Sequence, residues 1–254
     1  ILPDVSEYLG QTRELLLANK PFEARDIMTN ALKDSGYKGQ MASPFPLGDL
    51  KITQKAASAF KNYRRVLDMS VGEVTVEWDD GPTRFARSVF ASRSEEIIAV
   101  HLRKDGPGRI DANIGLGLHN LEDAKPTAGR LDAPTPKVPN HIESKAEDNW
   151  LFYAAQNDDG TDHGAVAWVS GVGNISTEGD ILRVEGGESI LVLVKLFVKQ
   201  SRTEAWKEMQ AELSAITDSY AKLLQNHGKI HTELFHKVHL DLGGDEESLQ
   251  SLDG

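Results

Sequence analysis

Short stretches of alternating apolar and polar residues recur between residues 47 and 200, and turn-forming residues separate them. Leu50–Thr53 and Val74–Trp78 show the alternation clearly. A period of two places apolar side chains on one face of a β-strand and polar side chains on the other. Many short strands at regular spacing predict a large antiparallel β-sandwich, which we assign to residues 37–202.

Glycine, proline and acidic residues mark the turns of this predicted sandwich. Asp79-Asp80-Gly81-Pro82 lies between Val74–Trp78 and the alternating segment Thr83–Phe90, so we expect a hairpin there. Gly186-Gly187 predicts a turn between two further strands. Residues 120–147 are rich in Pro, Asp, Lys and Asn and predict a long loop with at most short strand pieces.

Both ends of the chain have a helical period instead. Residues 1–36 predict a helical hairpin packed on the sandwich, with one helix ending at Asn19-Lys20 and Pro21 in the first turn of the next. Residues 203–243 predict a helical linker, in which Gly228 breaks the chain into two helices. Residues 244–254 predict the start of a connection to a further domain, since we expect the chain to be part of a longer one.

Composition excludes several classes of function. Lys and Arg number 28 against 39 Asp and Glu, and the formal net charge of -11 disfavours nucleic acid and anionic membranes as partners. No cysteine is present, which removes disulfides, thiolate nucleophiles, zinc fingers and iron–sulfur clusters. No apolar stretch approaches the roughly 20 residues that span a bilayer. We find no signal peptide in residues 1–254, and the composition does not identify a compartment.

Five segments, in order, resemble motifs of glycoside hydrolase family 95, the inverting α-L-fucosidases. The segment Pro46–Leu50 is similar to "QPLGDL", and Tyr63–Asp68 is similar to "YRRELDL". Thr83–Ser92 resembles "Y-x-RE-x-FAS", and the long segment His227–Gly243 resembles "H-x(3)-Y-x(2)-LF-x-RVSLDLG". The first helices resemble the family's "I-R-x-LL…A" hairpin at Thr12–Leu17 and Phe22–Ala24, and the departures from the family are His231 and His239.

This resemblance implies an architecture and a division of labour. Members of family 95 carry an N-terminal β-super-sandwich, a helical linker, an (α/α)6 catalytic barrel and a C-terminal β domain. The chain would supply the super-sandwich, without its opening strands, and the linker. The catalytic groups of the family lie in the barrel, so the resemblance implies no catalytic residue, cofactor or metal ligand here. It implies a fucosylated or galactosylated glycan as the partner of the whole enzyme, and the barrel as the intramolecular partner of this segment. Since enzymes that degrade glycans are commonly exported, the resemblance also favours an exported parent enzyme.

Two other interpretations stay open. A free-standing carbohydrate-binding module would be complete in itself and would display an exposed aromatic platform. The sandwich of another (α/α)6-barrel enzyme, such as a maltose phosphorylase-like protein of family 65, would share the Arg-Arg-Val-Leu-Asp strand motif loosely. The polypeptide after Gly254 distinguishes the interpretations, because a following barrel with an Asn-rich motif would support the first and a stop the free-standing module.

Tryptophans are the candidate carbohydrate contacts, because an aromatic ring can stack on the face of a pyranose. Trp78 beside a turn and Trp150 after a polar loop are the two candidates for exposure. Trp168 within a strand and Trp206 near the start of a helix are expected in the core or at an interface. Burial is the commoner fate of each ring.

Polar clusters give weaker indications. His227 and His231 are four residues apart, as in zinc sites, but the expected break at Gly228 argues against a shared helix face and places His227 at a helix end. The loop Asp158–His163 predicts a hairpin turn rather than a cation site, because the later Glu of a calcium loop is missing. Adjacent acidic pairs are interpreted as solvated turn charges: Asp79/Asp80, Glu95/Glu96, Asp158/Asp159 and Glu246/Glu247.

Overall fold

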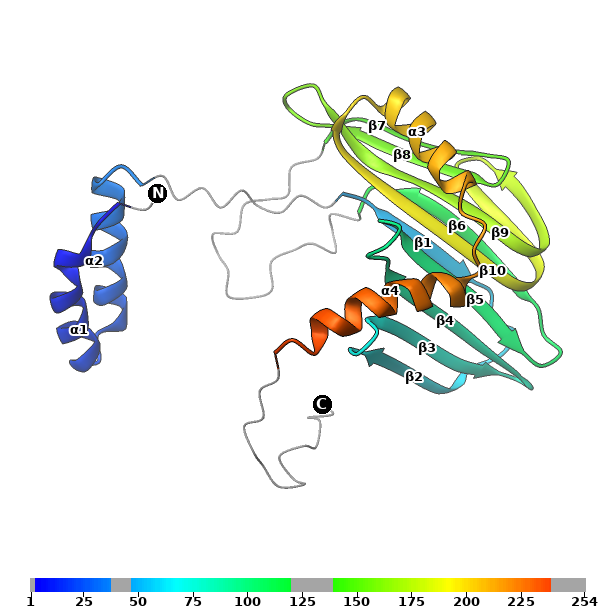
Figure 1. The fold of residues 1–254 in the computed structure, drawn as a ribbon, viewed down its shortest axis with the longest axis horizontal. Coiled ribbons are helices and arrows are strands. Elements are labelled where there is room, and N and C mark those ends of the chain that lie inside the picture. Colours follow the sequence, from blue (N-terminus) through cyan, green and yellow to red (C-terminus); the bar gives the residue numbers. More distant parts are fainter. Residues whose placement is uncertain (1–2, 38–46, 120–138, 239–254) are drawn as a thin grey trace. The chain divides into compact units, whose positions relative to one another are not determined.

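A computed structural model describes residues 3–37, 47–119 and 139–238 (Figure 1). The chain divides into two compact units, Ile1–Phe45 and Pro46–Gly254. The expected connection at residues 244–254 lies outside the described residues. No helix in the described ranges is long and apolar enough to cross a membrane.

The first unit is a pair of helices, as the sequence predicts. A 3-10 turn, η1 (Ser6–Tyr8), leads into α1 (Leu9–Leu17), and α2 (Pro21–Asp34) follows. Pro21 occupies the first turn of α2, where its missing N–H is not needed. The small side chains of Ala24 and Ala31 are buried. The expected packing of this hairpin on the sandwich stays a prediction.

The described residues of the second unit form ten antiparallel strands. Their bounds are β1 (Asp49–Gln54), β2 (Lys61–Asp68), β3 (Glu73–Asp80), β4 (Thr83–Ala91), β5 (Ile98–Asp105), β6 (Ile110–Gly117), β7 (Asn140–Glu147), β8 (Trp150–Gln156), β9 (Asp162–Glu178) and β10 (Ile181–Gln200). Two helices follow them, α3 (Arg202–Ser214) and α4 (Tyr220–Phe235). The predicted fold class, an antiparallel β-sandwich with flanking helices, is confirmed.

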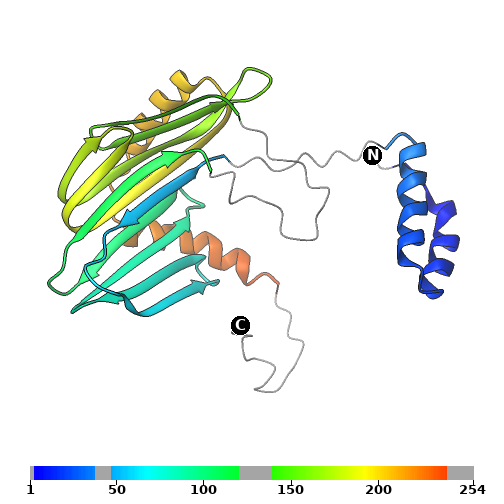
Figure 2. The same cartoon turned by 180° about the vertical axis from the view of Figure 1, so that it is seen from behind.

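The long hairpin of β9 and β10 joins the two layers of the sandwich. The larger layer has the strand order β2-β3-β4-β5-β10-β9-β8-β7. The first part of β10, including Leu182 and Val184, keeps its pairing with β9, but its other edge pairs with β6 in place of β5. β6 in turn pairs with β1. β10 therefore belongs to both layers, one through its start and the other through its end (Figures 1 and 2).

An apolar core fills the space between the layers. β6 supplies Ile110, Ile114 and Leu116, which alternate with the outward residues Asp111 and Asn113. The rest of the core comes from the facing strands, including Phe85, Leu102, Leu151, Tyr153, Leu182, Ile190 and Val192. Burying one such side chain stabilises the fold by about 1.5–3 kcal/mol, so this core is the main reason the layers stay together.

The outer face of the larger layer packs against α3 and α4. Leu213 of α3 and Leu223 of α4 are fully buried in a second apolar cluster. This cluster also contains Phe90, Phe152 and Leu193 from the sheet. The last part of α4 leaves its apolar side chains exposed, namely Ile230, Leu234 and Phe235.

The predicted hairpin at Gly81-Pro82 is confirmed. Trp78 pairs with Phe85 and Asp80 pairs with Thr83, so Gly81 and Pro82 form a two-residue turn. Gly81 has a φ of 59°, a value that glycine adopts without strain. The turn is shorter than the four residues expected, because both aspartates complete strand β3.

Two expectations for the later strands are wrong. Residues 140–147, assigned to the long loop, form the edge strand β7, which pairs with β8 despite its polar sequence. Residues 120–138 of that expected loop lie outside the described residues. Gly186-Gly187 does not end a strand, because β10 continues through it with a shift in register on both sides. The glycines form a bulge, since the single extended strand must bend there from one layer into the other.

The expected break at Gly228 is also wrong. Gly228 lies inside α4, and the helices separate at residues 215–219. Ser219 caps α4, and its side-chain oxygen accepts the Lys222 N–H at 3.4 Å. Thr217, Asp218 and Ser219 favour such a cap over a helix interior, whereas a single glycine costs a helix only about 1 kcal/mol.

Candidate functional site

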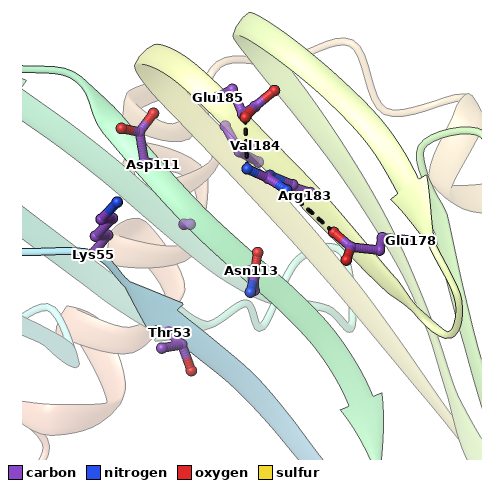
Figure 3. Close-up of a pocket in the computed structure, with 9 residues that line it drawn as sticks. Thr53, Lys55, Asp111, Asn113, Glu178, Arg183, Val184 and Glu185 are labelled. Carbon is purple, nitrogen blue, oxygen red and sulfur yellow. Dashed lines mark ion pairs between the residues drawn. The ribbon is translucent and has the colours of Figure 1, made fainter.

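A polar groove opens on the outer face of the smaller layer (Figure 3). Its volume is about 520 Å³. Strands β1, β6, β9 and β10 and the residue after β1 line it, with side chains from Thr53, Lys55, Asp111, Asn113, Glu178, Arg183 and Glu185.

A row of three polar side chains crosses the floor of this groove. Thr53 pairs in register with Asn113, and Asn113 pairs with Arg183. Residues that pair in register project from the same face of a sheet. The neighbours of this row along each strand, such as Ile52 and Ile114, point into the core, so the same alternation builds core and groove.

Hydrogen bonds and ion pairs hold the groove in shape. Arg183 lies between two carboxylates, 2.8 Å from Glu185 and 3.5 Å from Glu178 (Figure 3). The N–H of Gly186 donates to Asp111 Oδ1 at 2.8 Å, which fixes the bulge of β10 to β6. The N–H of Lys55 donates to the Asp111 carbonyl at 3.0 Å.

These groups suit the recognition of a polyhydroxylated ligand. A hydroxyl, an amide, a guanidinium and carboxylates provide both donors and acceptors, as sugar hydroxyls require. The side chains of Arg183 and Glu185 are each about half exposed, 50% and 49%, so the groove is open to water. Among the residues that the structure describes, no aromatic side chain lines the groove, so we expect these residues to hold a sugar by hydrogen bonds rather than by stacking.

Sequence reasoning missed this groove. Thr53, Asn113 and Arg183 are far apart in the chain and lie in segments with the same ordinary alternation. The alternation does indicate that they point outward. It does not give the pairing of β6 with both β1 and β10, which alone brings them together.

Trp78, the first candidate carbohydrate contact, lies on the inner face of the larger layer. Its ring stacks on Phe85, with centroids 5.8 Å apart and an interplanar angle of 19°. The Arg87 guanidinium lies 5.8 Å from the Trp78 ring centroid. The indole is half-buried and packs against the core between the layers.

Trp150, the second candidate, lies on the opposite face of the same layer. It stacks on Trp168, with centroids 6.1 Å apart, and packs at the edge of the cluster beneath α3 and α4. Trp206 of α3 packs in that cluster as well, as expected for an interface residue. Because Trp78 and Trp150 belong to opposite faces, the structure does not bring them together as one stacking platform.

His227 and His231 share one face of α4, contrary to the expected break. Their ring centroids are 5.1 Å apart. Arg93 donates to both rings, from its backbone N–H to His227 Nδ1 at 3.1 Å and from its side-chain Nε to His231 Nδ1 at 3.3 Å. The Nε2 atoms contact the carbonyl oxygens of Val71 at 2.9 Å and Met69 at 3.0 Å.

These contacts give both histidines a structural role. A nitrogen that accepts a hydrogen bond has no lone pair left for a metal, and the other nitrogen must then carry the proton. The described residues contain no group of three or more potential metal ligands. His227 joins α4 to the loops of the sheet through these contacts. It lies in the middle of α4, whereas the sequence predicts it at the end of a helix.

Asp80 is not a solvated turn charge. It is 8% exposed and accepts hydrogen bonds from the Ala57 N–H at 2.6 Å and from the Ser58 N–H at 2.8 Å. The Ser58 hydroxyl also donates to it at 2.6 Å. The hydrogen bond from the Ser58 side chain is the largest cause of the lowered pKa of Asp80, and the hydrogen bond from the Ala57 amide is the second. This carboxylate anchors the segment between β1 and β2.

The loop between β8 and β9 is a hairpin turn, as expected. Asp159 Oδ1 accepts the N–H and the hydroxyl of Thr161, at 3.0 and 2.5 Å. The Thr161 hydroxyl is the first cause of the lowered pKa of Asp159. Asp159 therefore closes the loop internally.

The fold and the groove define a β-sandwich domain with a helical pair on one outer face and an open polar surface on the other. The chain belongs to the family described as glycosyl hydrolase family 65, N-terminal domain, whose model matches residues 3–198. The N-terminal domain of a glycoside hydrolase family, which the motifs predicted, is thus confirmed at that level.

Comparison with solved structures finds a putative kojibiose phosphorylase from the human microbiome. The two share 12% identity with a TM-score of 0.45, over 73% of this chain. The chain spans 24% of the length of that protein. No curated protein matches the sequence.

Proposed function

We propose that the chain is the non-catalytic N-terminal scaffold of a carbohydrate-active enzyme of the family 65 type, a glycoside hydrolase or phosphorylase. The family match over residues 3–198 carries this proposal. It favours family 65, which the sequence left as the alternative, over family 95. The motifs that resemble family 95 form structural elements, among them β2 at Tyr63–Asp68 and β4 at Thr83–Ala91.

The reaction of the whole enzyme follows from this proposal. A family 65 enzyme of the maltose phosphorylase type cleaves an α-glucoside with phosphate, whereas a family 95 enzyme hydrolyses a terminal α-L-fucoside. Neither reaction requires a cofactor. In both cases we place the catalytic groups in an adjoining barrel, and α4 in the connection to it.

Turnover by the isolated segment and by the parent tests this proposal. We expect residues 1–254 to cleave neither maltose with phosphate nor an aryl α-L-fucoside. We expect the longer polypeptide to use one of them, with phosphate-dependent release of glucose 1-phosphate supporting family 65. Turnover by the segment, abolished by a substitution within it, would contradict the scaffold role.

The groove favours a second role, the binding of carbohydrate. Thr53, Asn113 and Arg183 present donors and acceptors in one row. Calorimetric titration with maltose and with fucosylated oligosaccharide checks this role, and Asn113→Ala should weaken any binding about tenfold, the loss of one or two hydrogen bonds. Asn30→Ala, at an exposed position of α2 outside the groove lining, is the matched control.

A further inference from the structure

A second hollow adjoins the groove at the end where Lys55 lies. Its volume is about 520 Å³, and it lies among the segment after β1, the turn between β3 and β4 and the turn between β5 and β6. Its lining includes Ala56, Pro82, Pro107 and Arg109. Lys55 and Asp111 line both the groove and the second hollow, so the two form one continuous depression.

The outward residues of β6, with the residue before this strand, set the length of the depression. Arg109, Asp111 and Asn113 are spaced two residues apart, and Ile110 and Ala112 between them are buried. At about 3.3 Å per residue, the distance from Arg109 to Asn113 is about 13 Å. This distance exceeds a single pyranose ring, so a saccharide that fills both hollows contains more than one sugar unit.

Hydrogen bonds hold the walls of the second hollow in place. Asp80 accepts the N–H groups of Ala57 and Ser58 at 2.6 and 2.8 Å on one side. On the other side, the Gly108 N–H donates to Thr83 Oγ1 at 2.7 Å, and Thr83 is 3% exposed. Because these walls are already ordered, a ligand would lose little free energy in shaping them.

The second hollow supplies the apolar surface that the groove lacks. Ala56, Pro82 and Pro107 line it and are exposed. A pyranose ring has C–H faces as well as hydroxyls, and covering the C–H groups with apolar side chains is favourable. The two hollows therefore complement the two kinds of surface that a saccharide presents.

Lys55 and Asp111 provide polar groups where the two hollows join. The Lys55 N–H donates to the Asp111 carbonyl at 3.0 Å, and Figure 3 draws no ion pair between their side chains. Asp111 Oδ1 accepts the Gly186 N–H at 2.8 Å, and within the described residues no hydrogen bond reaches its other oxygen. An ammonium donates and a carboxylate oxygen accepts, so this pair can bind two adjacent hydroxyls of a sugar.

Charges along the depression nearly balance. The cations in its lining are Lys55, Arg109 and Arg183, and the carboxylates are Asp80, Asp111, Glu178 and Glu185. Such a mixture attracts neither a strongly acidic nor a strongly basic ligand. A neutral saccharide is therefore the favoured occupant.

We propose that the groove and the second hollow bind one neutral oligosaccharide of at least two sugar units. One unit binds the row of Thr53, Asn113 and Arg183, and the next packs its C–H face against Pro82 and Pro107. The linkage between the two units lies over Lys55 and Asp111. This proposal rests on the carbohydrate-binding role proposed for the groove, and it adds the length and the charge of the ligand.

Calorimetric titration of residues 1–254 with glucose, maltose and maltotriose tests the proposal. We expect maltotriose to bind at least about tenfold more tightly than glucose, because further units add hydrogen bonds and apolar contact. Lys55→Met keeps the length of the side chain and removes its charge, and it should bring the two affinities close together. Lys229→Met, at an exposed position of α4 on the other outer face of the sandwich, is the matched control and should leave their ratio unchanged.

Three results would overturn the inference. Equal affinities for glucose and maltotriose would show that only one sugar unit binds, and would leave the role of the groove intact. Tighter binding of trigalacturonate than of maltotriose would contradict a neutral ligand. An unchanged ratio in Lys55→Met would contradict the position of the linkage. Absence of binding to every saccharide would also overturn the role of the groove, so the two failures are distinguishable, and neither depends on turnover.

Discussion

His227 connects α4 to two loops of the sheet at once: its Nδ1 accepts the Arg93 N–H at 3.1 Å, and its Nε2 lies 2.9 Å from the Val71 carbonyl oxygen. The residue is 2% exposed. One turn later, the Thr232 hydroxyl donates to the Ser70 carbonyl at 2.8 Å. Three consecutive carbonyls, from Met69 to Val71, are therefore bound by side chains of one helix.

Acid should weaken this attachment. Burial is the first cause of the lowered pKa of His227, and the neighbouring His231 and Arg93 lower it further, while the bond to Val71 opposes them. Below the ordinary value of 6.5 the unfolded chain binds a proton that the folded chain resists. The free energy of unfolding should thus fall as the pH drops from about 7 through 6.5 toward the folded-state pKa.

Urea denaturation of His227→Gln between pH 5 and 8 checks this expectation. Glutamine keeps a donor for Val71 and does not titrate, so part of the pH dependence should disappear. A remainder is expected, because burial also lowers the pKa of His101 and of His163. Glu96, which lines the same hollow as His227, is present in both wild type and the variant, so it does not account for a difference between their pH profiles. An unchanged pH profile would contradict the role of His227.

The Asp162 carboxylate, which binds Arg202 at the start of α3, should contribute strongly to the free energy of unfolding. It is 8% exposed and accepts three hydrogen bonds from Arg202, the shortest at 2.8 Å. We expect Asp162→Asn to lower the free energy of unfolding by about 2 kcal/mol, as for a hydrogen bond to a charged group. Asp180→Asn, at an exposed turn, is the control and should change little.

The pairing of Asp162 with Arg202 should also make the free energy of unfolding depend on pH in the acidic range. The hydrogen bond from the Arg202 side chain is the first cause of the lowered pKa of Asp162. Its stabilisation is present above the ordinary value of 3.8 and is lost as the pH falls through the folded-state pKa. Acid titration of wild type and Asp162→Asn should therefore converge at low pH, and parallel curves would refute the assignment.

Close approach of strands makes Gly164 irreplaceable. A Cβ at this position would lie 2.0 Å from the Tyr153 carbonyl oxygen and 2.9 Å from Ala154 Cα. Backbone atoms in a paired sheet cannot move aside, so Gly164→Ala should cost about 3 kcal/mol or prevent folding. Gly117→Ala is the matched control in β6, where the nearest atom is Ser144 Oγ at 3.8 Å. Thermal unfolding followed by circular dichroism compares the two, and equal Tm values would contradict the packing.

The exposed end of α4 should promote association of the isolated segment. Ile230, Leu234 and Phe235 are each more than two-fifths exposed, and β2 is an edge strand with every residue exposed. We expect residues 1–254 to be less stable and more prone to associate than the same residues in a longer polypeptide.

Sedimentation of both polypeptides at equal concentration, with thermal melts, checks this prediction. Leu234→Glu should reduce association of the segment without lowering its Tm. Leu17→Glu, in the helical hairpin, is the control for the loss of an exposed leucine. A monodisperse segment that melts as high as the longer polypeptide would favour a free-standing binding module instead.

Local pattern predicted most of the strands, and long-range pairing explains the errors. Val74–Trp78 and Thr83–Phe90 were identified by alternation and a tight turn, both of which are local properties. Asn140–Glu147 has few apolar residues and is a strand only because β8 offers its edge. Glycine is common both in turns that end strands and in bulges within strands. The sequence at Gly186 therefore fits either structure, and only the pairing of β10 with β6 and β9 shows that it is a bulge.

The candidate site residues show the same difference between what local pattern predicts and what depends on long-range strand pairing. The places of Trp168 in a strand and of Trp206 in a helix predict packing in the core or at an interface, and both rings pack against the cluster beneath α3 and α4. The positions of Trp78 and Trp150 on opposite faces require the order of strands across the layer, which no single segment contains. The groove at Thr53 and Arg183 depends on the same information.

The shared hairpin of β9 and β10 has a consequence for how the domain unfolds. Leu182 and Val192 lie on one continuous strand, yet the first pairs with the smaller layer and the second with the larger one. Neither layer can separate without stripping hydrogen bonds from the same backbone. The two layers should therefore melt in a single cooperative transition, and the slowest amides of β6 and β5 should exchange with solvent through one common opening of the whole sandwich.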